Sequence, residues 1–554
     1  MAEFANVSRR NLIKGMAAAG GVAALGGLAG CSAGGAGSES KEDAQAAAGE
    51  KHTWETKPEP IADIAETIDT EVLIVGGGYA GCCCAYSAAE NGLQVTLVEK
   101  SGTVNGNGIG GTGATASRAM DALGVKVDLP EERQRWLTVC GERVRGSLVS
   151  KFFRESERCM NWLLDLAEKH GAECMVTVGC EGKVWHEVAN YHWLYGGDLY
   201  DQFGPATFVE NIFRVEAEEL GAKFVFNTPA VQLVQDENGA VTGAICESDG
   251  KHVQYNASKA VVLATGDVSY NDEYMDHFVP IINKAKRIQT ILTNTGDGHN
   301  MAAWAGAALQ DGPWATCMDF QGGAMFRGPF MLVTPEGERC VNEGDWGQYA
   351  CIAVLKDGKT TEAWSVFDSN WEGDLVASLK YGGGGFWDTF RPVGSDESLA
   401  ASDYRATIED GLANDPDNYK RADTLEELAD MMGVDKQAFL AQVEKYNGYC
   451  DAGYDPDFFK EPGLLFPIKE GPFYALREIP AMLTTMSGIH ISDDFEVLTA
   501  DDEAIPGLYA IGNCSGDMYA IDYPISLQGN SHGHCLVMGK CLGEQLAGVY
   551  KETA

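Results

Sequence analysis

Glu71-Val72-Leu73-Ile74-Val75-Gly76-Gly77-Gly78-Tyr79-Ala80-Gly81 is the stretch that decides the fold of this chain. The apolar residues after Glu71 predict a short strand buried in a parallel sheet. The glycines satisfy the pattern G-x-G-x-x-G, and the small residues through Ala89 predict a helix packed closely on that sheet. Gln94-Val95-Thr96-Leu97-Val98 predicts a second strand, which ends at Glu99. This order of strand, glycine turn, helix, strand and acid predicts a doubly wound, Rossmann-like α/β fold that binds a dinucleotide.

Each part of this motif has a physical task. Backbone N–H groups at the helix N-terminus bind a pyrophosphate, and the turn that lets them approach it consists of Gly76, Gly78, Tyr79, Ala80 and Gly81. The Glu99 carboxylate accepts hydrogen bonds from ribose hydroxyls. An acid here, in place of a basic residue, favours a ribose without a 2′-phosphate. The cofactor is therefore predicted to be FAD or NAD.

Further glycine-rich turns favour FAD. A second such loop runs from Asn105 to Gly113, and the longer body of a flavin needs these additional backbone contacts. A buried strand with a turn is predicted at 261–266, and another turn that opens a helix at 294–299. A strand at 505–513 near the C-terminus completes the pattern.

The N-terminus has the features of an export signal. Arg9-Arg10 precede a weakly apolar stretch from Gly15 to Gly30, as in a twin-arginine signal. Leu28-Ala29-Gly30-Cys31 is typical of a lipobox, which predicts a lipid anchor at Cys31; a plain cleaved signal with a chance cysteine is the alternative. We expect 1–30 to be the signal, 31–69 a disordered tether, and the protein to be exported to the cell envelope as a membrane-anchored lipoprotein.

Composition narrows the class of function. The chain has 554 residues with 41 Lys+Arg and 81 Asp+Glu, a formal net charge of −40. That charge repels phosphate backbones, so no nucleic-acid partner is expected; solubility is the simpler reading of the acidity. Hydrophobic residues make up 45%, which allows a large core and excludes disorder throughout.

The 16 cysteines form neither C-x-x-C nor C-x-x-C-H, so an attached c-type haem on this chain is excluded by its motif. An iron–sulfur cluster held by scattered cysteines stays open, because no spacing indicates its ligands. His532 and His534 are two residues apart on a predicted helix and do not face one another as metal ligands. No metal site is predicted.

Taken together, these segments resemble the flavoprotein subunits of fumarate reductase, succinate dehydrogenase and 3-ketosteroid Δ1-dehydrogenase. Further family-like stretches are Gly337-Glu338-Arg339-Cys340-Val341-Asn342-Glu343 and Glu470-Gly471-Pro472-Phe473-Tyr474-Ala475. The resemblance implies a Rossmann-like FAD-binding domain at 70–311 that resumes at 486–554, with an inserted α+β cap domain at 312–485. It also implies that FAD is contacted by Glu99, Lys100, Asn107, Gly108, Gly113, Ala230, Asp297, Asn513, Asn530, Ser531 and His532.

The sequence departs from the fumarate-reducing members at three positions. Thr484 stands where they have a substrate-binding His, Gly347 where they have the Arg that donates a proton, and Ser526 where they have another Arg. A C4 dianion would be poorly bound without those cations. We therefore expect a substrate other than fumarate or succinate, with Thr484 and Ser526 still in the substrate site.

Asp522-Tyr523-Pro524 stands in the loop where the ketosteroid branch has Tyr-Pro. The resemblance implies that the Tyr523 phenol polarises a substrate carbonyl; a buried tyrosine packed under the flavin is the alternative. Tyr349 is the candidate for the missing acid, with a surface role as its alternative, and Trp346 is a candidate substrate contact.

These residues predict an FAD-dependent oxidoreductase acting on CH–CH bonds, specifically a reductase of a C=C bond conjugated to a carbonyl. Its expected partners are a small apolar unsaturated substrate and a separate electron donor, either a membrane quinol oxidase or a cytochrome or flavin carrier. Two alternatives remain: a ketosteroid-type dehydrogenase running in the oxidative direction, and a flavin lipoprotein that only transfers electrons.

Overall fold

The computed structural model describes residues 51–106, 111–178, 190–280, 285–287, 292–321, 326–327, 329–345, 347–356, 358–385, 388, 390–394 and 404–553. Several predictions lie outside these residues: the signal at 1–30, the anchor Cys31, and the site candidates Asn107, Gly108 and Trp346.

The central sheet has the strand order β19-β20-β9-β1-β2-β6. These strands are β1 (Ile64–Val75), β2 (Val95–Val98), β6 (Lys223–Val225), β9 (Lys251–Leu263), β19 (Glu496–Leu498) and β20 (Ala504–Ala510). Pairing is parallel from β20 to β6, and β19 is antiparallel to β20. A hairpin of β7 (Ala230–Gln235) and β8 (Val241–Ser248) extends the sheet from β9. The strand predicted before the glycine turn (β1) and the strand predicted near the C-terminus (β20) thus lie on either side of β9.

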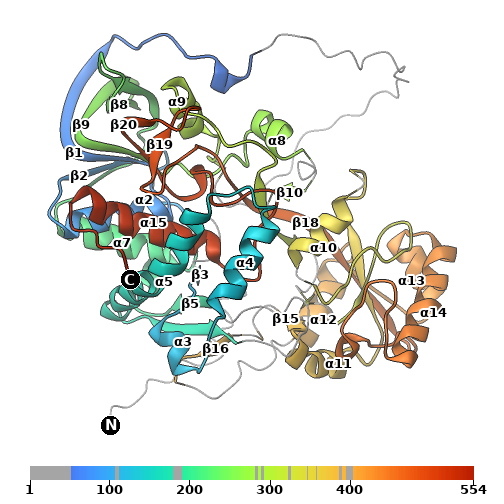
Figure 1. Cartoon of the computed structure of the whole chain (residues 1–554). Helices are drawn as coiled ribbons and strands as arrows, with labels where there is room; N and C mark the ends of the chain where they lie inside the picture. The colour runs from blue at the N-terminus through green and yellow to red at the C-terminus, as the bar shows by residue number, and fades with distance from the viewer. Residues whose placement is uncertain are drawn as a thin grey trace, which may run out of the picture.

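Helix α2 (Tyr79–Glu90) follows the glycine turn and is buried along almost its whole length. It packs against α7 (Phe208–Glu219) and α15 (Asn530–Leu546), and these helices lie together under the central sheet (Figure 1). The Ser87 hydroxyl donates to the Lys540 carbonyl at 2.8 Å, and the small residues of α2 allow this close approach. The C-terminal helix therefore belongs to the same core as the N-terminal dinucleotide motif.

A second sheet forms the core of the cap. Its order is β10-β18-β14-β13, with β11 and β17 also paired to β18. The strands are β10 (Lys286–Arg287), β11 (Ala315–Gln321), β13 (Met331–Val333), β14 (Ala363–Phe367), β17 (Tyr419–Ala422) and β18 (Phe473–Met486). The cap helices, seen at the right of Figure 1, are α10 (Gly347–Leu355), α11 (Trp371–Ser378), α12 (Tyr404–Asn414), α13 (Leu425–Met432) and α14 (Lys436–Ala452).

A smaller sheet links the two parts in the order β16-β4-β5-β3. Its strands are β3 (Thr112–Gly113), β4 (Glu173–Thr177), β5 (Tyr191–Tyr195) and β16 (Phe390–Pro392). The two-stranded ribbon pairs β12 (Phe326–Arg327) with β15 (Gly384–Gly385). The remaining elements are η2 (Thr53–Glu55), α3 (Arg118–Ala122), α4 (Leu129–Val139), α5 (Gly146–Lys169), α6 (Asp198–Phe203), α8 (Asp272–Phe278), α9 (Asp297–Trp304), η3 (Leu379–Tyr381), η5 (Pro462–Leu464) and η6 (Gly512–Cys514).

The architecture confirms the predicted fold class, a Rossmann-like domain with an inserted α+β cap. The residue boundaries given for the two domains stay predictions. Among the described residues no helix combines the length and apolar character that a membrane crossing needs.

The structure differs from the predicted disordered tether over residues 51–69. The Glu273 carboxylate accepts from the Thr53 backbone N–H at 3.0 Å and from its hydroxyl at 2.7 Å. The Trp54 ring lies 4.4 Å from that of Tyr274, and β1 already begins at Ile64. This segment lacks hydrophobic periodicity, so its order depends on contacts with α8 that are distant in sequence.

Candidate functional site

The glycine turn after β1 is pressed against the turn after β9. Gly76 has φ +111°, and a Cβ placed there would lie 2.3 Å from the Ala264 carbonyl oxygen. Only glycine fits both the conformation and the contact. Gly78 is the N-cap of α2 and has no side chain to cap it, so the first N–H groups of the helix are available to a phosphate. Gly76, Gly78, Tyr79, Ala80 and Gly81 are thus at the predicted strand–helix junction.

Glu99 lies at the carboxyl end of β2 and is buried. Its Oε2 accepts from the Gly77 N–H at 2.6 Å, and its Oε1 accepts from the Ser101 N–H at 2.7 Å. A carboxylate offers about four acceptor positions, so Glu99 retains capacity for ribose hydroxyls. The backbone carbonyl of Glu99 accepts from the Thr228 N–H at 2.9 Å, which brings the start of β7 and hence Ala230 to the same end of the sheet.

Two other predicted cofactor residues contact each other. The Lys100 ammonium donates to the Asp297 carboxylate at 2.8 Å and to the Thr295 hydroxyl at 3.0 Å. Asp297 is the first residue of α9, where a carboxylate is stabilised by the helix dipole. The pair joins the ends of β2 and the 294–299 turn, which are almost two hundred residues apart in sequence.

The N-terminus of α15 is held by β3. The Gly113 N–H donates to the Gly529 carbonyl at 2.8 Å, and a Cβ at Gly113 would lie 2.1 Å from the Gln528 carbonyl oxygen. The Asn530 side chain donates to the Pro524 and Leu527 carbonyls at 3.0 and 2.7 Å, and its Oδ1 accepts from the Tyr519 hydroxyl at 2.9 Å. The amide of Asn530 therefore fixes the loop that carries Tyr523.

Tyr523 is fully buried under this helix end. Its phenolic oxygen accepts from the Ser531 backbone N–H at 3.1 Å. Burial raises the pKa of Tyr523 well above its ordinary value, which keeps the phenol neutral. No acceptor for the phenolic proton is found among the described residues. The hydroxyl can therefore donate to a ligand while the helix N–H withdraws charge from its oxygen.

A chain of hydrogen bonds connects α15 with the cap strand β18. The Ser531 hydroxyl donates to Asn513 Oδ1 at 3.2 Å, and Asn513 Nδ2 donates to the Thr484 hydroxyl at 3.0 Å. Thr484 in turn donates to Asp267 Oδ2 at 3.0 Å. The structure thus brings together three predicted site residues, Ser531, Asn513 and Thr484.

Asp267 accepts the hydrogen bond at the end of this chain and was not predicted as a site residue from the sequence. It is buried and also accepts from the Thr485 N–H at 2.6 Å, from the Ser269 hydroxyl at 3.0 Å and from Asn294 Nδ2 at 2.5 Å. Its position directly after the β9 turn was the available signal, because ligands in doubly wound folds lie at the carboxyl ends of the strands.

His532 lies on the other side of the helix end. Its ring stacks on Tyr79 with centroids 4.9 Å apart, and its Nδ1 lies 2.9 Å from the Gly111 carbonyl oxygen. Tyr79 Oη and Thr112 Oγ1 are 2.8 Å apart. The first glycine motif and α15 therefore meet directly here.

The remaining substrate candidates lie near α4 and α10. The Ser526 hydroxyl donates to Glu132 Oε2 at 2.8 Å. Glu132 and Glu131 also pair with Arg135, at 2.5 and 2.8 Å. Tyr349 is half-buried, and burial followed by the charge of Asp522 raises its pKa. Arg135, whose charge acts on Tyr349, is thus already paired with two carboxylates.

Asp522 and Gln348 complete this group and were given no role from the sequence. Asp522 Oδ1 accepts from Gln348 Nε2 and from the Tyr523 N–H, both at 2.7 Å. Gln348 is fixed in turn, since it donates to the Thr316 carbonyl at 2.8 Å and accepts from the Met318 N–H at 2.6 Å. Burial raises the pKa of Asp522 to about 6.

These residues fit FAD. A long dinucleotide needs backbone amides for its phosphates and an acceptor for its ribose. The N-termini of α2 and α15 supply the amides, Glu99 supplies the acceptor, and the glycines let the backbone come close to the cofactor. Fourteen cysteines are described and all are free thiols. Within the same residues no group of three or more His, Cys, Asp or Glu is placed to hold a metal ion.

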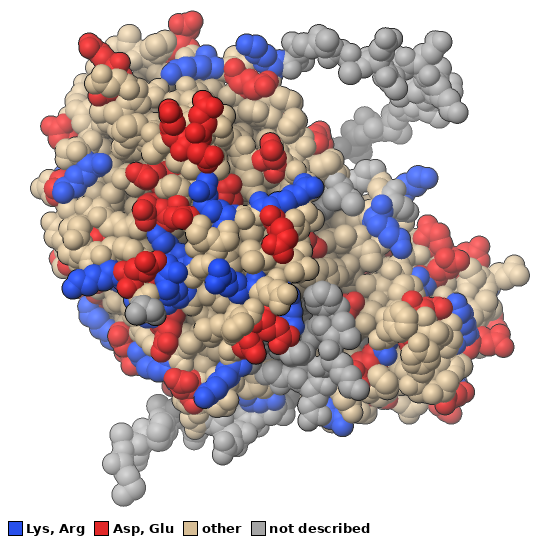
Figure 2. All heavy atoms as spheres, viewed as in Figure 1, with Lys and Arg blue, Asp and Glu red and all other residues tan. Residues whose placement is uncertain are grey.

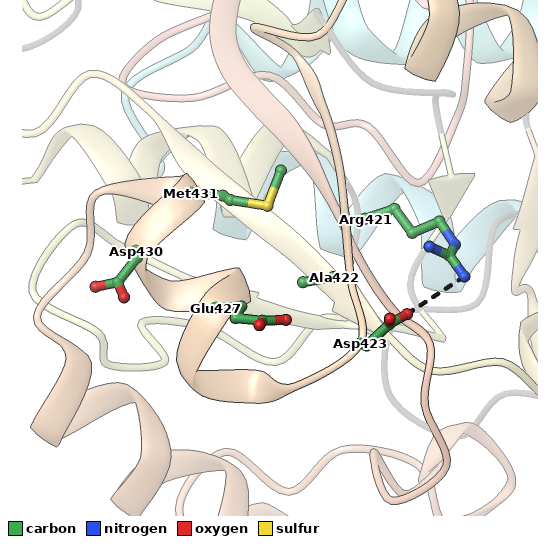
Figure 3. A pocket seen from close by; sticks show the side chains of 6 residues that line it. All are labelled: Arg421, Ala422, Asp423, Glu427, Asp430 and Met431. Carbon is green, nitrogen blue, oxygen red and sulfur yellow. Dashed lines mark ion pairs between the residues drawn. The ribbon is translucent and has the colours of Figure 1, made fainter.

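One open depression of about 420 Å³ lies elsewhere, on the cap. Figure 3 shows its lining, Arg421, Ala422, Asp423, Glu427, Asp430 and Met431, with an ion pair of 3.5 Å between Arg421 and Asp423. None of the predicted site residues lines it. On the face shown in Figure 2, Lys and Arg side chains are interspersed with Asp and Glu.

The fold and this site define an FAD-dependent oxidoreductase. The chain belongs to the FAD binding domain family, whose model matches residues 71–526. It is 28% identical to the fumarate reductase (cytochrome) of Shewanella frigidimarina over 88% of this chain and 78% of that protein. It is 29% identical to the urocanate reductase of Eggerthella lenta over 86% of this chain and 75% of that one. The structure of a 3-ketosteroid-Δ4-(5α)-dehydrogenase from Rhodococcus jostii RHA1 superposes with a TM-score of 0.68 at 22% identity, covering 89% of this chain and all of that chain. The predicted family, FAD and the enzyme class acting on CH–CH bonds are thereby confirmed.

Proposed function

We propose that this protein reduces a C=C bond conjugated to a carbonyl in an enone, an unsaturated lactone or an unsaturated acid other than fumarate. The observation that carries the proposal is the buried Tyr523 phenol, which accepts from the N–H of Ser531 and has its own proton available. A neutral donor in a dry site stabilises an enolate oxygen as negative charge develops there.

FAD, when bound and reduced, supplies the hydride that adds to the β-carbon. The protein binds the carbonyl oxygen through Tyr523, and the N-terminus of α15 offsets developing negative charge. The chain from Ser531 through Asn513 to Thr484 holds this helix end against the cap strand β18. Tyr523, Asn530 and Thr484 are buried, and the exclusion of water strengthens each of these hydrogen bonds.

The same site disfavours a C4 dianion. Thr484 and Ser526 offer hydroxyls where the fumarate-reducing relatives are expected to have cations, and Ser526 is already bound to Glu132. The guanidinium of Arg135 is paired with Glu131 and Glu132. The small apolar unsaturated substrate of the proposal needs none of these charges.

A second candidate is the reverse reaction, a dehydrogenase that inserts a double bond beside a ketone. The Tyr523-Pro524 dipeptide favours it, because the phenol can stabilise an enolate in either direction. Oxidation of a saturated ketosteroid with an artificial acceptor, with no reduction of any enone, would establish this alternative.

The proposal includes export and an external electron donor. Support comes from the Arg9-Arg10 signal and the Cys31 lipobox of the sequence. NAD(P)H is not freely available outside the cytoplasm, so electrons would come from a membrane quinol oxidase or from a cytochrome or flavin carrier. Labelling with a radioactive fatty acid in wild type and in Cys31→Ala tests the anchor.

The experiment is an anaerobic titration of the holoenzyme. Reduced viologen first reduces the flavin, and enones, cinnamates, urocanate, steroids and fumarate are then added singly while the flavin spectrum is recorded. We expect rapid reoxidation by at least one conjugated alkene and slow reoxidation by fumarate. Reoxidation by no alkene in the panel would contradict the proposal and favour a protein that only transfers electrons.

A further inference from the structure

The proposed reduction needs a proton donor for the α-carbon, and the arginine that fumarate-reducing relatives are expected to use is absent at Gly347. The neighbouring residue, Gln348, extends from the start of α10 to the carboxyl of Asp522, with Nε2 to Oδ1 at 2.7 Å. The Asp522 carboxyl, on the loop that also carries Tyr523, is thus held against the start of α10.

The hydrogen bonds of Asp522 leave one oxygen for chemistry. Its Oδ1 accepts from both Gln348 and the Tyr523 N–H, whereas its Oδ2 has no hydrogen-bond partner among the described residues. Because Oδ1 already accepts two hydrogen bonds, the protonated carboxyl group carries its proton on Oδ2. The Gln348 side chain is itself held by Thr316 and Met318 of β11, so the carboxyl has a fixed orientation.

Cys317 shows that Asp522 and Tyr523 flank the same space. It lies opposite Thr484 in the β11–β18 ladder, and residues directly opposite each other point to the same face of a sheet. Burial raises the pKa of the Cys317 thiol, and the charges of Asp319 and Asp522 raise it further. Cys317 in turn raises the pKa of Tyr523. The carboxyl and the phenol therefore lie near one thiol that faces the Thr484 side of the ladder.

We propose that Asp522 is the general acid of this enzyme, and this assignment rests on the proposed function. As the hydride from reduced FAD reaches the β-carbon, the O–H bond at Asp522 breaks and a C–H bond forms at the α-carbon from the enolate electron pair. The carboxylate then takes a proton from solvent, and the phenol of Tyr523 keeps its own proton throughout.

The surroundings of Asp522 suit an acid that works near neutral pH. The titratable groups that face it are Cys140, Cys317 and Tyr349, and burial raises the pKa of each. Asp345 and Arg135 are the other charged groups that act on Tyr349, and Arg135 is paired with Glu131 and Glu132. With its pKa near 6, Asp522 is a far stronger proton donor than the neighbouring phenol of Tyr349.

The test uses the reduced holoenzyme with the alkene that reoxidises wild type fastest. In Asp522→Asn we expect reoxidation by the alkene to slow about 100-fold or more, the usual contribution of general acid catalysis. Reoxidation by ferricyanide and FAD content should stay at wild-type values. The wild-type rate should fall as pH rises through about 6, as the acid loses its proton. Asp522→Asn should lose this pH dependence, and Asp522→Glu should recover part of the rate.

Asp345→Asn is the matched control, because burial also raises the pKa of Asp345 to about 6 and this residue also lies near Tyr349. We expect it to retain the rate within about threefold and to keep the pH dependence. The assignment is overturned if Asp522→Asn retains a wild-type rate and pH profile, or if Asp345→Asn alone loses them. A wild-type enzyme that no alkene reoxidises overturns the proposed function itself, and the assignment with it.

Discussion

The backbone N–H of Ser531 donates to the phenolic oxygen of Tyr523 at 3.1 Å. This hydrogen bond occupies an acceptor position of the phenolic oxygen, and the positive N-terminal end of the α15 dipole points toward that oxygen. No acceptor for the phenolic proton is found in the part of the chain that the structure describes, so this proton can be donated to a ligand. A tyrosine that merely packed under the flavin would not need this arrangement, whereas a hydrogen-bond donor to a developing enolate gains from it.

Tyr523→Phe should reduce the rate of alkene-dependent flavin reoxidation by about 100- to 1,000-fold, the effect of removing one donor to a developing oxyanion. Stopped-flow absorbance of the reduced flavin measures it. Tyr519→Phe removes the hydroxyl of the neighbouring stacked ring, which bonds to Asn530. That control should lower the unfolding temperature while the rate changes little. Equal losses of rate in both variants would contradict a direct role for Tyr523.

Asp267→Asn should weaken FAD binding and destabilise the protein by about 1–3 kcal/mol, because donors that now converge on a carboxylate lose their acceptor. The orientation of Thr484, and through it of Asn513, depends on that carboxylate. Fluorescence of released FAD and the denaturation midpoint measure the two effects. Asp311→Asn, an exposed carboxylate, is the control; an Asp267→Asn protein that binds FAD as tightly as wild type would show that the hydrogen-bond chain is dispensable.

Glu210 should make the protein less stable as pH rises. It is buried in α7, neither carboxyl oxygen has a hydrogen-bond partner among the residues that the structure describes, and burial raises its pKa to about 8. The folded state therefore keeps a proton that the unfolded state releases above about 4.5. This stability is fully present below about pH 4.5 and is lost progressively up to about pH 8, at no more than about 1.4 kcal/mol per pH unit.

The measurement for Glu210 is the denaturant midpoint across pH 5 to 8 in wild type and Glu210→Gln. We expect the variant to have a flatter dependence, while Glu237→Gln on the exposed turn after β7 follows wild type. Parallel curves for wild type and Glu210→Gln would mean that Glu210 is ionised in the folded protein.

The cap contains a buried ion network whose disruption should be costly. Arg339 bonds to Glu343 at 2.7 Å and to Asp455 at 2.9 Å, and the Lys460 ammonium lies 3.3 Å from Glu343. Arg339→Met leaves two carboxylates buried with one cation, so the free energy of unfolding should fall by about 3–5 kcal/mol. Arg405→Met breaks the exposed pair with Glu372 and should leave the free energy of unfolding nearly unchanged. Similar losses for the two variants would contradict this difference.

The sequence predicted the parts of the fold whose signals are local. The turn from Gly76 to Gly81 and the acid at Glu99 define a strand, a helix and a second strand within thirty residues, and the structure has them there. Order at 51–63 was missed because it depends on Glu273 and Tyr274, more than two hundred residues away.

The candidate site was predictable only in part for the same reason. Tyr523, Thr484 and Ser531 were predicted as site residues from the resemblance, but Asp267 and Gln348 belong to no motif and become recognisable through their partners. The Asn530 side chain is fully engaged with its own loop, so a role at the cofactor would fall to its backbone. Local sequence could not predict the roles of Asp267, Gln348 and Asn530, because each role depends on contacts with segments that are distant in the sequence.

Strand β18 has a mechanical consequence. Its first half pairs with β14 and β17 inside the cap, and its second half pairs with β11 and ends at Thr484 and Thr485, which bind Asp267 beside the flavin domain. One continuous backbone is therefore shared by both bodies. A rotation of the cap relative to the flavin domain would therefore have to bend or shift this strand. Such a rotation would also move Thr484, and the hydrogen bond between Thr484 and Asn513 would change with it.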